Sequence, residues 1–275
     1  MNQYFKTINL DLSTHFIGKR IIHYKTISST QDLAISLAEA GTPNENGTVI
    51  ISDEQYGGKG RGSKKWISLK GGIWVSLIIK PIIPVNKINL LPLLPTISVC
   101  EVINELFNLE TRIKWPNDIV IDNKKIAGIL IDSSIKNNII NYIVIGVGIN
   151  LKVDVKKIDS YLKHTIGFQQ KVTSIHNVAS IRYGDRLILL KKILERIEHY
   201  LILVQNDIEN TKLIQIYKQL SNTIGKSIYV YSHDNKKYRA FAYDIDNDCG
   251  LLIQNENNNR EKIHFGEISI REMDS

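Results

Sequence analysis

The sequence lacks the residues that a structural metal site or a disulfide framework requires. Its 275 residues include two cysteines, Cys100 and Cys249, which form no C-x-x-C pair and no metal-ligand spacing with any of the seven histidines. Structural zinc sites depend on such spacing, so the sequence argues against one. A low cysteine count is also typical of a reducing compartment.

Long apolar runs are missing as well. The longest candidate, 88–103, is interrupted by Pro92, Pro95 and Glu101, whereas a transmembrane helix needs roughly 18 consecutive apolar residues. The first residues, MNQYFKTINLDLS, show no basic segment followed by an apolar one, as a secretory signal would. We therefore expect a cytoplasmic protein with no membrane partner.

Charge of one sign is not concentrated anywhere in the chain. The net charge is +7 and the pI is about 9.2, but the basic residues are spread along the sequence. This balance favours anionic ligands such as phosphates, or an acidic partner protein, and does not by itself indicate nucleic-acid binding. The hydrophobic fraction of 43% is that of an ordinary globular protein.

The hydrophobic pattern predicts an α+β main domain over 1–222 and a small β-barrel over 223–275. Helices are expected at 33–40, 91–107, 185–204 and 209–220, and strands at 48–52, 73–79, 112–115, 119–121, 125–132 and 139–146. The polar stretch 151–180 is expected to be a surface excursion. The barrel strands are expected at 227–231, 238–244, 251–254, 262–265 and 268–271.

The strongest local signal is a loop that combines glycines with cations, GGKGRGSKKW at 57–66. Glycines let the backbone approach a ligand closely, and Lys59 and Arg61 add positive charge, so the loop suits a phosphate or a polyphosphate leaving group. The GK[ST] order of a Walker A loop is absent, and the loop leads to Trp66 rather than into a helix as a dinucleotide fingerprint does. A flexible basic surface loop is the alternative reading.

Two further motifs place a cation beside other polar or planar groups. In KWPND (114–118), Asp118 could hold Mg²⁺ through its carboxylate; an ordinary hairpin turn is the alternative. In KKIAGIL (124–130), Lys125 opens an apolar strand and could neutralise a carboxylate or phosphate, with Gly128 leaving room for a planar ligand. Strand alternation places Lys125 and Ala127 on one side. A solvent-facing lysine is the alternative here.

Two weaker signals complete the set. In GVGIN (146–150), two alternate glycines clear one face of a strand end, and Asn150 could bond to the edge of a nucleobase. In Ser28-Ser29-Thr30, a hydroxyl is well placed to begin the helix that follows, so a helix cap is the alternative to ligand contact.

Taken together and in this order, the motifs resemble those of the biotin protein ligases, the biotin–[acetyl-CoA-carboxylase] ligases. The likeness runs from about Ser28 to Asn150 and resumes at GEISIR (266–271), which is similar to the closing signature of the family's C-terminal SH3-like barrel. It implies a mixed-sheet catalytic domain of the class II synthetase-like biotin/lipoyl ligase type. It also implies a two-step reaction in which ATP and biotin give biotinyl-5′-AMP and pyrophosphate, and biotin then passes to a lysine of biotin carboxyl carrier protein.

The resemblance assigns roles to the matching residues. Lys125 and Arg61 are expected to be catalytic and to contact both biotin and the adenylate, and Asp118 to place Mg²⁺. The remaining biotin-binding positions are Ser29, Thr30, Gln55, Gly58, Gly128, Gly146 and Gly148. The remaining adenylate-binding positions are Lys59, Trp66, Asn150, Glu267 and Arg271.

Two features depart from the usual pattern of the family. Lys59 stands where an arginine is usual, so the loop is expected to hold the adenylate less tightly. Gly62-Ser63 replaces the usual residue-then-glycine order, so the folding of the loop on its ligand is expected to differ. About 27 residues precede Ser28, fewer than the DNA-binding domain of some relatives needs, so we expect a monofunctional form that binds no operator. Members of the family pair edge to edge through the main sheet, so the resemblance also allows a homodimer.

Three other functions remain open at this stage. A lipoate–protein ligase or octanoyltransferase shares the catalytic architecture, although the KWPND and KxAGIL motifs favour biotin. A non-enzymatic sensor of biotin or nucleotide would use the same pocket without chemistry. A nucleic-acid-binding barrel protein has the basic pI alone in its favour and predicts a steeply salt-dependent affinity for duplexes.

Overall fold

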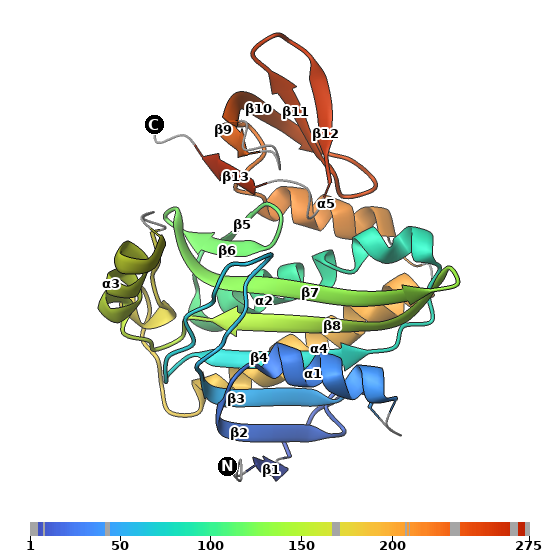
Figure 1. The fold of residues 1–275 in the computed structure, drawn as a ribbon, viewed down its shortest axis with the longest axis vertical. Coiled ribbons are helices and arrows are strands. Elements are labelled where there is room, and N and C mark those ends of the chain that lie inside the picture. Colours follow the sequence, from blue (N-terminus) through green and yellow to red (C-terminus); the bar gives the residue numbers. More distant parts are fainter. Residues whose placement is uncertain are drawn as a thin grey trace.

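The computed structural model describes residues 5–7, 9–41, 45–166, 171–206, 208, 210–231, 237–264 and 269–272. Two sheets carry the architecture (Figure 1). The larger sheet has eight strands in the order β1-β2-β3-β4-β8-β7-β6-β5, and all its pairs are antiparallel except β2 with β3. Its strands are β1 Phe5–Thr7, β2 Ile21–Ile27, β3 Val49–Gln55, β4 Ile73–Ile79, β5 Arg112–Lys114, β6 Asp118–Ile121, β7 Lys124–Lys136 and β8 Ile139–Ile149.

Helix α1 (Thr30–Ala40) covers one face of this sheet (Figure 1). The Ser29 hydroxyl accepts a hydrogen bond from the backbone N–H of Asp32 at the first turn, and Gly41 ends the helix with φ of 64°. Ala34 and Ala38, one turn apart, are buried against β2, β3 and β4, since small side chains let the helix lie close to the sheet. The N-terminus of α1 is thereby held at the end of β3 and β4 where the polar motifs gather.

The opposite face is covered by α2 (Leu93–Phe107), α4 (Asp185–Gln205) and α5 (Asn210–Leu220). A 3-10 turn, Val85–Leu90, leads into α2. The combined segment Val85–Phe107 is long and apolar enough to cross a membrane by length and composition, but 67% of its most apolar stretch is buried inside this structure. It is therefore a helix of the protein core. Each residue of strand β4 is buried, because both faces of the sheet are covered.

The second sheet is antiparallel, in the order β12-β11-β10-β9-β13. Its strands are β9 Lys226–Tyr231, β10 Lys237–Ile245, β11 Leu251–Asn255, β12 Arg260–Ile263 and β13 Ser269–Glu272. It lies beyond β5 and β6 and packs on α5 (Figure 1). Its buried side chains, such as Val230 and Ile253, belong to the same hydrophobic cluster as α2 and α4, so one continuous core runs through both sheets.

The predicted α+β class with a mixed sheet and a C-terminal β unit is confirmed. The prediction for 151–180 is wrong in part: α3 (Val155–Ile166) and a 3-10 turn (Ile175–Asn177) lie there, and Ile158 of α3 is buried. Polar residues, lysine among them, outnumber the apolar positions of this segment. The division at residue 222 remains a prediction.

Candidate active site

A cavity of about 1200 Å³ lies on the α1 face of the larger sheet and extends under the second sheet. The motifs between Ser28 and Asn150 contribute to its wall: Thr30, Gln55, Arg61, Trp66, Asp118, Lys125, Gly128, Gly146, Gly148 and Asn150 all line it. These residues come from α1, β3, β6, β7, β8 and the loop after β3. The topology therefore joins motifs that are up to 120 residues apart in the sequence.

The glycine-rich loop is an ordered hairpin that lies over the cavity. Gly60 N–H donates to the Lys64 carbonyl at 2.8 Å, and Trp66 N–H donates to the Gly58 carbonyl at 2.9 Å. Gly62, at its tip, has φ of +63°, a conformation that favours glycine. An added Cβ at Gly58 would lie 2.4 Å from the Trp66 carbonyl, so this glycine permits the hairpin to close. The segment is therefore a hairpin with an exposed tip, and its role as a ligand loop stays a prediction.

A β-bulge determines where the Lys125 side chain points. Val120 pairs with Lys125 and Ile119 with Ala127, so Ile126 is the extra residue on β7. The expectation that Lys125 and Ala127 share a face is therefore wrong. Ala127 is buried in the core, whereas Lys125 lines the cavity with Gly128. The bulge aims the lysine at the site.

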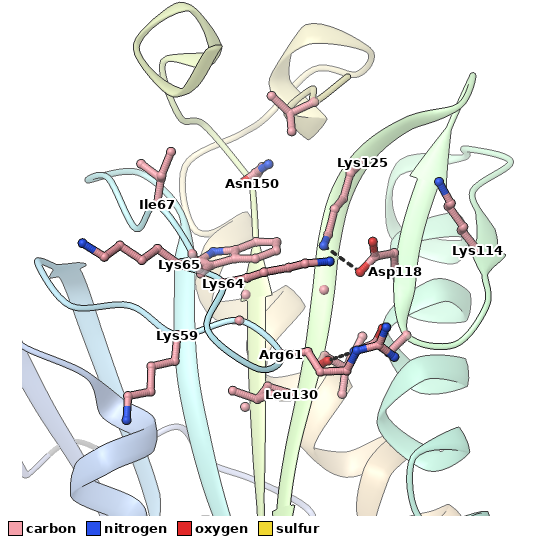
Figure 2. A pocket seen from close by; sticks show the side chains of 18 of the residues that line it. Lys59, Arg61, Lys64, Lys65, Ile67, Lys114, Asp118, Lys125, Leu130 and Asn150 are labelled. Carbon is pink, nitrogen blue, oxygen red and sulfur yellow. Dashed lines mark hydrogen bonds and ion pairs between the residues drawn. The ribbon is translucent and has the colours of Figure 1, made fainter. Parts of the chain in front are cut away.

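Lys125 lines the cavity, where its side chain faces Asp118 (Figure 2). Its Nζ is 2.6 Å from Asp118 Oδ1, and its Nζ is 4.8 Å from the centroid of the Trp66 ring. A carboxylate and the face of an aromatic ring both attract a cation, so the two contacts hold the lysine head group in place. The side chains of Lys125 and Asp118 are 15% and 22% exposed, so the charges are largely shielded from water.

Arg61 adds a second cation to this centre. Figure 2 shows its side chain extending into the cavity from the hairpin. Burial lowers the pKa of its guanidinium, and the negative charge of Asp118 opposes part of that effect. A guanidinium remains charged at neutral pH in spite of such a shift, so Arg61 and Lys125 together form a cationic pair for an anionic ligand.

The end of the cavity near α1 carries neutral hydrogen-bonding groups instead. Thr30 N–H donates to Gln55 Oε1 at 2.7 Å, and Gln55 Nε2 donates to Ser68 Oγ at 2.7 Å. The Thr30 hydroxyl is 2.9 Å from Ser76 Oγ. Such a set of amides and hydroxyls, with no charge among them, suits a neutral polar ligand such as an amide or a urea. Ser29 differs, because its hydroxyl is engaged as the helix cap.

Three glycines of the predicted floor accommodate protein side chains. An added Cβ at Gly128 would lie 2.8 Å from Trp66 Cζ3, and one at Gly148 would lie 2.7 Å from Trp66 Cε2. One at Gly146 would lie 2.5 Å from Gln31 Oε1. The Trp66 indole thus lies flat over β7 and β8, and its N–H is buried without a hydrogen-bond partner within the described part of the chain.

The wall near α3 is apolar. Ile158, Leu162 and Val172 line the cavity beside Trp66 and Trp74. Asn150 lies at this side, where its Nδ2 donates to the Thr173 carbonyl at 3.1 Å. An aromatic and aliphatic slot with an amide at its rim suits a planar heterocycle such as a nucleobase.

The KWPND turn is held from three directions. Trp115 N–H donates to Thr223 Oγ1 at 2.9 Å, its indole N–H donates to the Cys249 carbonyl at 3.4 Å, and Tyr217 donates to the Pro116 carbonyl at 2.7 Å. Asn117, within the turn, donates through its Nδ2 to the Ile129 carbonyl. Asp118 therefore projects from a turn that α5 and the second sheet keep in place.

The other predicted positions lie apart from this centre or outside the described residues. Lys59 Nζ is 2.5 Å from Asp32 Oδ1 on α1, and Figure 2 shows its side chain directed away from Lys125. Glu267 lies outside the described residues. Arg271 is on β13, where its backbone is paired with that of Tyr229, a residue that lines the cavity. Lys226, Tyr231 and Lys237 of the second sheet also line it.

The arrangement can bring two anions together beside a neutral recognition end. Biotin has a neutral cyclic urea and a carboxylate, and ATP has a planar base and a polyphosphate. The cavity offers neutral hydrogen-bonding groups, a pair of cations and an apolar slot, which together complement such a pair of ligands.

Comparison with known proteins decides the family. Residues 24–150 match the Biotin/lipoate A/B protein ligase family, and residues 223–271 match the Biotin protein ligase C terminal domain. The chain is 32% identical over 265 residues to a bifunctional ligase/repressor, BirA, of Bacillus subtilis, covering 96% of this chain and 78% of that protein. The chain belongs to the biotin protein ligase family.

Other relatives agree with this assignment. The biotin–[acetyl-CoA-carboxylase] ligase of Mycobacterium tuberculosis is 27% identical over 235 residues, covering 83% of this chain and 80% of that one. The solved structure of the biotin protein ligase from Aquifex aeolicus in complex with biotin and ATP has a TM-score of 0.73, covers 93% of this chain and 100% of its own, and is 24% identical. That likeness shows the fold.

Gln31 and Ser76 are among the residues of the site that were not predicted from the sequence. Gln31 belongs to none of the motifs, yet it is buried and bonds to Asp132 and Ser76. Ser76 sits within the apolar run of β4 as its one hydroxyl residue. A buried serine in an otherwise aliphatic strand is the signal that could have identified it.

Proposed function

We propose that this cavity is the site at which the ligase activates biotin with ATP and then transfers it to a carrier protein. The chain is an ATP-dependent biotin–[acetyl-CoA-carboxylase] ligase. The observation that carries the assignment of residues is the position of Lys125, which lines the cavity with its Nζ 2.6 Å from Asp118 Oδ1 and 4.8 Å from the centroid of the Trp66 ring. The residue roles rest on this geometry and on the motifs.

In the first step, a carboxylate oxygen of biotin attacks the α-phosphorus of ATP, and pyrophosphate leaves with the bonding electrons. Lys125 and Arg61 reduce the repulsion between these two anions and stabilise the charge that develops on the phosphoryl oxygens. The neutral end formed by Thr30 and Gln55 holds the ureido ring, so the carboxylate tail extends toward Lys125. Trp66 and the wall near α3 hold the base.

In the second step, the neutral amine of a carrier lysine attacks the carbonyl carbon of biotinyl-5′-AMP. AMP leaves with the electron pair, and the nitrogen loses a proton as the amide forms. The cationic pair stabilises both the carbonyl oxygen and the leaving phosphate. No residue of the enzyme forms a covalent bond in either step.

Mg²⁺ is proposed to arrive with the nucleotide. The described residues hold no group of three or more His, Cys, Asp or Glu that could bind a resident metal. Asp118 is the carboxylate that lines the cavity, which fits an ion held mainly by phosphate oxygens and by one protein carboxylate. The ion would offset the charge of the departing pyrophosphate.

The proposed partner is the biotin carboxyl carrier domain of a biotin-dependent enzyme, and the proposed compartment is the cytoplasm, where ATP and the carrier are both present. No nucleic-acid or membrane partner is proposed. The proposed homodimer would pair sheet edges, for which β1 and β5 are the outer strands of the larger sheet.

Pyrophosphate release from ATP and Mg²⁺ tests this function, with biotin, lipoate or octanoate as the acid. We expect biotin-dependent release that falls by at least 10²-fold in Lys125→Ala, since one preorganised electrostatic group contributes about 10²–10³ to kcat. Lys124→Ala is the matched control, because Lys124 is the exposed neighbour on the same strand, and we expect it to retain activity.

The other outcomes separate the alternatives. Release with lipoate or octanoate alone would assign the chain to the lipoyl ligases. Biotin binding without release would identify a sensor. Equal loss of activity in Lys124→Ala and Lys125→Ala would show that the role assigned to Lys125 is wrong.

A further inference from the structure

A continuous chain of hydrogen bonds runs behind the neutral end of the cavity. Gln31 Nε2 donates to Asp132 Oδ2 at 2.8 Å and to the Val144 carbonyl at 3.2 Å. Ser76 Oγ donates to Gln31 Oε1 at 2.9 Å, and Ser76 Oγ is also 2.9 Å from Thr30 Oγ1. Gln31, Ser76 and Thr30 are 4%, 1% and 3% exposed, so water does not compete for these bonds.

The orientation of the Gln31 amide is determined by its neighbours. A carboxylate oxygen and a backbone carbonyl can only accept hydrogen bonds, so the group that faces Asp132 and Val144 must be the NH₂. Reversing the amide would place its oxygen against two acceptors. Gln31 Oε1 therefore faces Ser76, and Gly146 leaves the space that it occupies, since an added Cβ there would be 2.5 Å from that oxygen.

This orientation sets the direction of each hydroxyl in the chain. Gln31 Oε1 can only accept, so the single proton of Ser76 Oγ points at Gln31. The proton of Thr30 Oγ1 must then point at Ser76, since two lone pairs facing each other at 2.9 Å would repel. Thr30 is left with no proton to offer the cavity, and it presents an acceptor only.

Gln55 presents the opposite polarity beside it. Its Oε1 accepts from the Thr30 N–H, so its NH₂ is turned to Ser68 and retains a second N–H. The cavity therefore combines an acceptor on Thr30 with a donor on Gln55. Adjacent N–H and C=O groups, as in a urea, match this pair.

We propose that Gln31 and Asp132 are positioning residues for ligand specificity, because they fix Thr30 as a pure acceptor that selects a ring N–H over a ring oxygen. This inference rests on the proposed function, in which the ureido ring of biotin binds at Thr30 and Gln55. Neither Gln31 nor Asp132 needs to touch the ligand. They act through Ser76, because they determine which way the hydroxyl protons of Ser76 and Thr30 point.

The test compares biotin with its two cyclic carbamate analogues, each of which has one ring N–H replaced by oxygen. Dissociation constants are measured by calorimetry on the full chain. In the wild type, the analogue with oxygen facing Thr30 should bind at least 10²-fold more weakly than biotin, since the site then holds two acceptors in contact. In Gln31→Leu and in Ser76→Ala, the Thr30 hydroxyl can turn and donate, so this ratio should fall by at least tenfold.

Two further variants sharpen the comparison. Asp132→Asn keeps an oxygen that accepts from Gln31 and should retain the wild-type ratio, whereas Asp132→Leu should lower it. Gln215→Leu is the matched control, because Gln215 lies on the exposed side of α5 and should leave the ratio unchanged. Ser76→Ala removes few atoms and covers the case in which Gln31→Leu fails to fold.

The results separate this inference from the function on which it rests. If the wild type binds no biotin, the proposed function fails. If the wild type binds biotin but Gln31→Leu and Ser76→Ala weaken biotin and both analogues equally, the residues have only a structural role and the inference is overturned.

Discussion

The position of the Trp66 indole depends on two glycines, which leave the space that it occupies. Gly128 and Gly148 sit side by side on β7 and β8, and their registers pair them directly. An added Cβ at either position would come within 3.0 Å of the indole. The indole in turn lies against Lys125, so the absence of two methyl groups positions the central cation of the site.

We therefore expect Gly148→Ala to displace Trp66 and to weaken both folding and ATP binding. Overpacking a well-packed region costs about 1–3 kcal/mol, which urea unfolding would measure. The affinity for ATP, followed by tryptophan fluorescence, should fall by roughly tenfold for each 1.4 kcal/mol lost from binding. An unchanged unfolding midpoint together with unchanged ATP affinity would show that Trp66 does not need this space.

At the scale of single residues, the sequence predicts the motifs but not the direction in which their side chains point. Lys125, Arg61, Gly128 and Gly148 carry recognisable spacing, and all line one cavity. The bulge that turns Lys125 into that cavity depends on pairing with β6, which no local pattern encodes. Gln31 was missed for a similar reason, since its partners Asp132 and Ser76 are far away in the sequence.

Among the elements, the turn between β10 and β11 links the second sheet to the KWPND motif. Asp246 Oδ1 accepts from the backbone N–H groups of Asp248 and Gly250 at 3.0 and 2.9 Å, and Asp246 also pairs with Lys262. Within this turn, the Cys249 carbonyl accepts the indole N–H of Trp115. The carboxylate thus shapes the turn that meets the active-site motif.

The free energy of unfolding should depend on pH through the Asp246 carboxyl of this turn. Burial tends to raise the pKa of Asp246, but hydrogen bonds from Lys262, Gly250 and Asp248 outweigh burial and lower it below its ordinary value. A carboxyl with a lowered pKa in the folded state stabilises the protein fully above its unfolded pKa of about 3.9, and this contribution is lost as pH falls through the lower folded value. Asp246→Asn should therefore be less stable than wild type at pH 6 by about 1 kcal/mol, since the pair is partly exposed.

Thermal unfolding at pH 6 and pH 3 measures this difference. The gap between wild type and Asp246→Asn should narrow at pH 3, where the wild-type carboxylate is becoming protonated. Asp122→Asn is the control, since Asp122 is exposed in a turn, and it should unfold at the wild-type temperature at pH 6. A gap for Asp246→Asn that stays constant with pH would contradict the role of its charge.

The predicted elements were most accurate where periodicity was strong and both ends carried a turn signal. Strand Ile73–Ile79 has the predicted bounds, and the helix Asp185–Gln205 extends the prediction by one residue. The prediction missed α3, in which apolar residues such as Val155, Ile158 and Leu162 recur at helical spacing but are outnumbered by polar ones. Strand β2 was not predicted, since its apolar run is short and interrupted by polar residues.

For the molecule as a whole, the two sheets share one hydrophobic core. Trp115 of the KWPND turn, Tyr217 of α5 and Leu251 of the second sheet are all buried in the same cluster. Three hydrogen bonds, from Trp115 to Thr223 and Cys249 and from Tyr217 to Pro116, cross this region. Because the core is continuous, we expect the described parts of the chain to unfold as one cooperative unit.

Thr223→Val tests whether the contacts of the shared core also support the adenylation of biotin. The substitution leaves the buried backbone N–H of Trp115 without its acceptor, which costs about 1–3 kcal/mol. Asp118 follows three residues after Trp115, so a shift of the turn should also move the carboxylate that pairs with Lys125. We expect a lower unfolding midpoint with a single transition, and a fall in pyrophosphate release of several-fold at temperatures where the variant is folded.

Thr211→Val is the matched control, since Thr211 is exposed on α5 and should match the wild type in both measurements. If Thr223→Val lowered the midpoint but left pyrophosphate release intact, the second sheet would stabilise the fold without positioning Asp118. Two separate unfolding transitions, one of them alone shifted by Thr223→Val, would contradict the shared core. A single shifted transition with reduced adenylation requires that the same contacts hold the fold and the active-site turn together.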